Sequence, residues 1–176
     1  NLYRAAEENR ADIARPLIDR GDDVDSRDGS NATPLFAAAF SNSLQVATLL
    51  VENGADVNAL DDGSWSPLLL ASHFNSIEVA VLLIRNGANI EAKDDTGCSS
   101  LYYASLLHSF KLVNFLIGHG ANADGIDLNW MRDQEDGKKE DDIPELTSVK
   151  QASTDSVRAI MLIRAYRIIM DKMVSN

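Results

Sequence analysis

Side chains that could bind a metal ion or act as nucleophiles are few and widely spaced in this sequence. The 176 residues include three histidines, His73, His108 and His119, and one cysteine, Cys98. A zinc site needs cysteine or histidine pairs only a few residues apart, and no such pair occurs. Gly29, Gly63 and Gly97 are isolated turn glycines, and no glycine-rich phosphate-binding loop occurs. We therefore expect no catalytic site, no metal site and no cofactor, and a protein that is not an enzyme.

The composition restricts the class of partner. The net charge is -11, and hydrophobic residues make up 45% of the chain, enough for a substantial core. Excess negative charge repels phosphates, so we expect no nucleic-acid partner and favour basic or neutral ones. A single cysteine excludes an intrachain disulfide and fits a reducing, intracellular location, cytoplasmic or nuclear. Charged residues interrupt the apolar segment 157–174, so we expect no membrane insertion.

The elements that must position any binding residue follow an internal period. Glycines recur every 33 residues, at Gly21, Gly54, Gly87 and Gly120. Two further series share this step: Leu2, Leu35, Leu68 and Leu101, and Ala5, Ala38, Ala71 and Ala104. Such a period is typical of a solenoid made of stacked copies. His73 and His108, 35 residues apart, take nearly equivalent positions in successive copies.

Each copy is predicted to contain two helices followed by a projecting loop. Thr33 suits a helix N-cap, and Pro34 suits the first turn of the helix that follows. Apolar residues at helical spacing predict a second helix within residues 43–54, and Gly54 suits its left-handed C-terminal cap. Because two short helices cannot bury their apolar faces alone, neighbouring copies must stack.

These motifs resemble the ankyrin repeat family. Its Thr-Pro-Leu-His start and Gly-Ala-x-x-Asn end are matched closely by residues 33–36 and 54–58, and less closely in the third and fourth copies. The histidine of the family motif is replaced in the four copies by Tyr3, Phe36, Leu69 and Tyr102. The resemblance implies an all-α ankyrin-repeat solenoid of stacked helix-turn-helix units with projecting β-hairpin-like fingers.

The predicted organisation divides the chain into three parts. Four repeats occupy residues 1–126, with bounds 1–27, 28–60, 61–93 and 94–126, the first being a charged capping repeat. Pro16 predicts a late start or a bend in that repeat's second helix. Residues 127–142 are predicted to be an acidic, mobile insertion. Residues 143–176 are either a degenerate fifth repeat or a long C-terminal helix that caps the stack.

The resemblance implies a concave binding face made by the fingers and the first helices. The period identifies the side chains expected on that face: Phe40, Asp62, Trp65, His73, Phe74, Asp95, Tyr103, Leu106 and Leu107. Aromatic residues with polar atoms dominate interface energies, and the carboxylates would form a rim. The repeats carry most of the negative charge, so a basic and aliphatic peptide segment is the predicted partner.

We therefore predict a non-catalytic protein–protein interaction scaffold. One alternative is a regulatory or targeting ankyrin domain of a larger enzyme or channel, with the C-terminal helix as connector. Another is self-association through that apolar helix. The resemblance also implies hydroxylation at Asn58. Differences between the second and third loops, such as Asn58 against Glu91 and Leu60 against Lys93, indicate separately adjustable contact sites.

Overall fold

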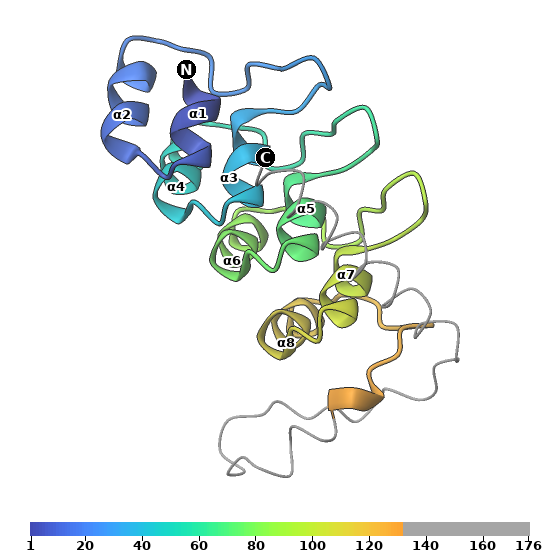
Figure 1. The fold of residues 1–176 in the computed structure, drawn as a ribbon. Helices are drawn as coiled ribbons and strands as arrows, with labels where there is room; N and C mark the ends of the chain where they lie inside the picture. Colours follow the sequence, from blue (N-terminus) through green and yellow to red (C-terminus); the bar gives the residue numbers. More distant parts are fainter. Residues whose placement is uncertain (132–176) are drawn as a thin grey trace, which may run out of the picture.

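The computed structural model describes residues 1–131, and its eight α-helices form four successive pairs (Figure 1). The pairs are α1 (Leu2–Glu7) with α2 (Ala11–Asp19), α3 (Pro34–Phe40) with α4 (Leu44–Glu52), α5 (Pro67–His73) with α6 (Ile77–Arg85), and α7 (Ser100–Leu106) with α8 (Phe110–Gly118). A short 3-10 helix, η1 (Asn129–Met131), follows. The remainder of the predicted insertion and the predicted fifth repeat or capping helix lie outside the described residues.

The pairs stack side by side, and the loops between them project from one side of the stack (Figure 1). Each first helix packs against the next first helix, and each second helix against the next second helix. The first helices α1, α3, α5 and α7 lie between the loops and the second helices. Within residues 1–131 the loops form turns rather than strands, with one isolated bridge between Lys93 and Ser99. This arrangement places the first helices beside the projecting loops.

The core consists of equivalent residues from successive copies. The leucine series and the alanine series found in the sequence are both buried, and so are Leu50, Leu83 and Leu116 of the second helices. Burying one leucine side chain contributes about 2 kcal/mol, while the small alanines let adjacent helices approach closely. Since these residues face neighbouring copies, stacking supplies the burial that a single helix pair lacks.

The helix N-caps differ between copies. Ser66 and Ser99 each accept a hydrogen bond in the first turn, from the N–H groups of Leu69 (3.2 Å) and Tyr102 (3.3 Å). Thr33 has the extended backbone of a cap, but its side chain makes no capping bond, and its buried hydroxyl has no hydrogen-bond partner in the described part of the chain. The prediction that Thr33 caps α3 is therefore correct for the backbone and wrong for the side chain.

The turns between paired helices use a left-handed residue at every copy. The residues are Asn9, Asn42, Asn75 and His108, with φ between 50° and 56°. Asparagine and histidine tolerate this region better than most non-glycine residues. His108 therefore belongs to this asparagine series, and the residue equivalent to His73 is Leu106. The two-residue offset between the histidines, 35 against the period of 33, is enough to give them different surroundings.

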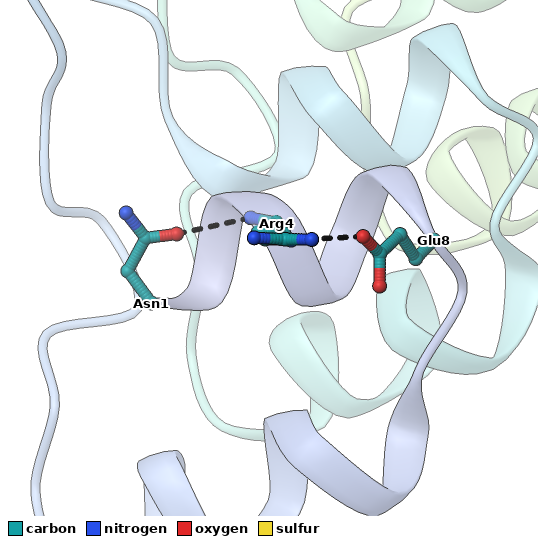
Figure 2. A network of polar contacts seen from close by, with 3 residues as sticks. All are labelled: Asn1, Arg4 and Glu8. Atoms are coloured by element: carbon teal, nitrogen blue, oxygen red, sulfur yellow. Dashed lines mark hydrogen bonds and ion pairs between the residues drawn. The ribbon is translucent and has the colours of Figure 1, made fainter.

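The first copy begins the stack with exposed polar side chains (Figure 2). The Asn1 side chain caps α1 by accepting from the Arg4 N–H (3.0 Å), and Arg4 pairs with Glu8 (2.9 Å). The helix α2 starts at Ala11, one period before Leu44, and runs unbroken past Pro16. The expected late start is therefore wrong, because packing against α1 and α4 holds α2 in place despite the proline.

Neighbouring loops are joined by hydrogen bonds that follow the period. Side-chain oxygens of one copy accept from a backbone N–H of the next: Asp25 from Asp56 (3.0 Å), Asn58 from Asn89 (2.7 Å) and Glu91 from Asn122 (2.9 Å). The Asn58 amide also donates to the Gly87 carbonyl (3.1 Å). Asn58 and Glu91 thus perform the same structural role. From the sequence, their difference had indicated separately adjustable contact sites.

The four periodic glycines end the second helices with a left-handed residue. Gly54 has φ +87°, and the next N–H, of Ala55, donates to the Leu50 carbonyl (3.0 Å) to close the cap. A side chain at Gly54 would meet no atom within 4 Å, so only the backbone conformation opposes substitution there. Gly29 also has open space around it, but its φ is not positive.

We predict that Gly54→Ala lowers the free energy of unfolding by about 1–2 kcal/mol, the cost of a left-handed non-glycine residue. The matched control Gly29→Ala should change stability by less than about 0.5 kcal/mol. Urea unfolding followed by circular dichroism measures both. Equal effects of the two substitutions would contradict a backbone origin for the periodic glycines.

Candidate protein-binding surface

Five rings from three copies form a continuous series of contacts, here named the aromatic row. Phe40, at the end of α3, contacts Phe74, at the end of α5, with ring centroids 4.5 Å apart. Phe74 contacts His73 (4.9 Å), and His73 lies 5.4 Å from Trp65 and 4.9 Å from Tyr103. Trp65 stacks on Tyr103 at 5.1 Å and 28°. The structure thus brings together five of the nine residues predicted for partner binding.

The members of the aromatic row differ in exposure. Phe40 is 49% exposed, and Trp65, His73 and Phe74 are half-buried. Tyr103 is only 7% exposed, as is the predicted contact Leu106. Tyr103 and Leu106 therefore support the surface from below, whereas the other four rings offer atoms to the solvent.

The row rests on a small apolar cluster separate from the main core. Its buried members are Leu69, Tyr103 and Leu106, and Trp65 and Cys98 pack against it. Although Trp65 lies in a turn-rich loop, α7 of the next copy brings Tyr103 directly against its indole ring.

Asp94 fixes the position of Tyr103. Its carboxylate accepts a short hydrogen bond from the Tyr103 hydroxyl, and further bonds from the Thr96 hydroxyl (2.6 Å) and the N–H groups of Thr96 (2.9 Å) and Cys98 (3.0 Å). Burial acts to raise the pKa of Asp94, but the hydrogen bonds outweigh it, and the pKa lies below its usual value. Burial, followed by the bond to Asp94, raises the pKa of Tyr103, which therefore stays protonated and donates.

Sequence reasoning did not identify Asp94 as support for the site. The signal is its place in the series Asp28, Asp61 and Asp94, each of which accepts from two N–H groups of its own loop. Nine residues after each aspartate stand Ala37, Leu70 and Tyr103. A hydroxyl is available at that position only in the fourth copy, which distinguishes Asp94 from its equivalents.

The remaining predicted residues lie apart from the row's ring contacts. Asp62 and Asp95 are exposed in the loops, and Asp62 accepts from the Asn31 side chain (3.0 Å). Leu107 is half-buried at the C-cap of α7. Asn58, where the resemblance implies hydroxylation, is exposed in its loop, and its modification stays a prediction.

The three histidines belong to different local structures. His108 lies against Trp130, with centroids 4.8 Å apart, and His119 stacks on Phe115 at 4.1 Å. Over residues 1–131 no three histidine, cysteine or carboxylate side chains are grouped to hold a metal ion. No helix in the same range is long and apolar enough to cross a membrane.

Comparison with known proteins identifies the repeated unit. The family described as ankyrin repeats (many copies) matches residues 35–84, from the second residue of α3 to the last residue but one of α6. A search of curated proteins finds no match.

We predict that Asp94→Asn destabilises the fold by about 1–3 kcal/mol at pH 7, because a buried hydroxyl loses its charged acceptor. Since the folded pKa of Asp94 is lowered, its contribution is present above the unfolded value of about 3.9 and is lost as the pH falls through the folded value. The difference from wild type should therefore shrink below about pH 4. Urea unfolding at several pH values measures it.

Asp61→Asn is the matched control, because Asp61 caps its own loop through the Gly63 and Trp65 N–H groups without a tyrosine partner. A cost for Asp94→Asn no larger than for Asp61→Asn would show that the Tyr103 bond contributes nothing.

Proposed function

Since the chain is a member of the ankyrin repeat family by its match over residues 35–84, we propose that it is a non-catalytic scaffold that binds another protein through its concave face. Ankyrin repeats generally mediate protein–protein interactions. On this proposal the binding face is formed by the first helices and the projecting loops, which lie beside one another along the stack (Figure 1).

The aromatic row is the observation that carries the proposal. It crosses the first helices of three copies and includes Phe40, one of few large apolar side chains that are substantially exposed in the described range. Aromatic side chains provide large contact area at low entropic cost, and such residues dominate binding energies. Because the ring contacts already fix the row, a partner would find it ordered before binding.

Charge supports a basic and aliphatic peptide segment as the partner. Residues 1–130 hold 18 acidic and 8 basic residues, whereas residues 131–176 hold 9 and 8. Asp62 and Asp95 extend this negative charge onto the loops. Their field would accelerate the approach of a basic segment and orient it, while the apolar rings would supply most of the affinity.

The loop hydrogen bonds limit the entropy cost of binding. Each loop is bonded to the next, as where Asp62 N–H donates to the Ser30 carbonyl (3.1 Å) and Asn58 accepts from Asn89. A surface that needs little reordering retains more of its contact energy as affinity. The single free cysteine, Cys98, fits a reducing compartment, and we propose an intracellular partner.

We predict that the double substitution Trp65→Ala and Phe74→Ala weakens partner binding at least about 30-fold, the effect of losing about 2 kcal/mol of hot-spot energy. The partner is first isolated with the wild-type chain and identified by mass spectrometry, and affinity is then measured by calorimetry. Phe40→Ala, at an exposed position, tests the same surface with less effect on folding. Ile13→Ala, on the exposed side of α2, is the control and should leave affinity unchanged.

Unchanged affinity in both Trp65→Ala/Phe74→Ala and Phe40→Ala, with native circular dichroism spectra, would refute the proposed face.

We also predict that raising the salt concentration from 0.1 M to 1 M slows association of the partner at least about tenfold and changes dissociation little. Added salt shortens the screening length from about 10 Å to about 3 Å, which removes long-range steering but not apolar contact. Stopped-flow kinetics with the isolated partner measures both rates. An association rate that does not depend on salt would show that the negative charge of the repeats does not steer the partner.

A further inference from the structure

The indole ring of Trp65 lies among residues at which the copies differ. The equivalents of Trp65 in the neighbouring loops are Ala32 and Cys98, both much smaller than a tryptophan. The third loop must therefore accommodate a ring that the second and fourth loops lack. Two parts of the ring meet other residues closely: one edge lies beside the backbone of its own loop, and one face lies against α7 of the next copy.

Gly63 leaves space for the edge of the ring. A Cβ atom at this position would lie 3.1 Å from the Cδ1 atom of Trp65, a tighter contact than most Cβ atoms make. The equivalent residues of the neighbouring loops, Ser30 and Thr96, both carry side chains. The φ angle of Gly63 is not positive, so the backbone conformation does not require glycine. It is therefore the indole ring, rather than the turn, that favours glycine at this position.

Tyr103 supports the face of the ring. Its own ring stacks on the indole at 5.1 Å and is held at its hydroxyl by Asp94, a residue of the fourth loop. The other carboxylate oxygen of Asp94 accepts from N–H groups of that loop, so the tyrosine is tied to the loop backbone. The equivalents of Tyr103, Ala37 and Leu70, offer neither a ring nor a hydroxyl. Departures from the period on two sides of the indole thus meet at one ring.

We propose that Gly63 and Tyr103 are positioning residues of the binding face, which hold the Trp65 indole in the orientation that a partner recognises. The inference rests on the proposed function and adds that affinity depends on residues which the partner does not touch. Tyr103 is only 7% exposed, and Gly63 has no side chain. An indole that is fixed before binding retains more of its contact energy as affinity, because the partner need not order it.

The orientation of Trp65 can be followed without a partner. The chain has two tryptophans, Trp65 and Trp130, so protein labelled with fluorotryptophan should give two fluorine NMR signals, which Trp130→Phe assigns. We expect Gly63→Ala to shift the Trp65 signal and to leave the Trp130 signal in place. Gly29→Ala, where an added Cβ meets no atom within 4 Å, is the matched control and should shift neither. An unmoved Trp65 signal in Gly63→Ala would overturn the inference.

Affinity for the partner isolated with the wild-type chain is then measured by calorimetry. We expect Gly63→Ala to weaken binding at least about threefold, because the ring must move by a few tenths of an ångström. Tyr103→Leu, which introduces the side chain of the equivalent Leu70, removes the whole support and should weaken binding at least about tenfold. Gly29→Ala should leave affinity unchanged. Circular dichroism spectra establish that each variant is folded.

A double-mutant cycle with Trp65→Ala separates positioning from direct contact. If both residues act through the indole, Gly63→Ala and Tyr103→Leu should have no further effect on affinity once Trp65 is alanine. A loss of affinity that persists in the Trp65→Ala background would overturn the inference, because the substituted residues would then act on the partner or on the fold directly.

The same measurements distinguish failure of this inference from failure of the proposed function. If Trp65→Ala itself leaves affinity unchanged, the proposed face is wrong, and the inference is wrong with it. If Trp65→Ala weakens binding while Gly63→Ala and Tyr103→Leu do not, the face stands and only the positioning role is refuted.

Discussion

Burial of one copy's helix pair by the next is the interaction on which the rest of the structure depends. A pair of helices of seven and nine residues has too little interior to stabilise itself, and nearly all its leucines face a neighbour. The register of 33 residues must therefore be kept within about one residue, because a slip would turn the buried series toward solvent. The left-handed turn residues and the glycine caps keep this register, since each fixes where one helix stops and the next begins.

The hydrogen bonds between loops hold the projecting loops in place, which the stacking of helices does not do. Stacked helices alone would leave the loops attached only at their ends, whereas Asp25, Asn58 and Glu91 tie each loop to the next along the stack. An aspartate, an asparagine and a glutamate can exchange here because the acceptor oxygen is all that the neighbouring N–H requires. Sequence variation at such a position therefore preserves the link and changes the charge that the loop presents.

The sequence predicted the repeated helix pairs well, because period, caps and burial are local or repeat at a fixed step. The helix starts at Ala11, Leu44, Ile77 and Phe110 follow that step without exception. What the sequence could not provide were contacts between unlike positions of different copies. The stacking of Trp65 on Tyr103 joins a loop residue to a residue of the next copy's helix, and the bond from Tyr103 to Asp94 exists in one copy only. A period identifies equivalent residues, but it does not show which non-equivalent residues touch.

Departure from the period is consequently where specific recognition can arise. Positions that are the same in every copy hold the buried leucines and the capped turns, which serve stacking. These positions do not distinguish one copy from another for a partner. Where the copies differ, as at Phe40, His73 and Leu106 in equivalent positions, the surface changes from an exposed ring to a half-buried one and then to a buried aliphatic side chain. This gradient gives the side formed by the first helices and the loops a direction along the stack. A peptide segment bound there would meet its most accessible ring at α3 and its most enclosed apolar floor at α7, so that its two orientations would not be equivalent.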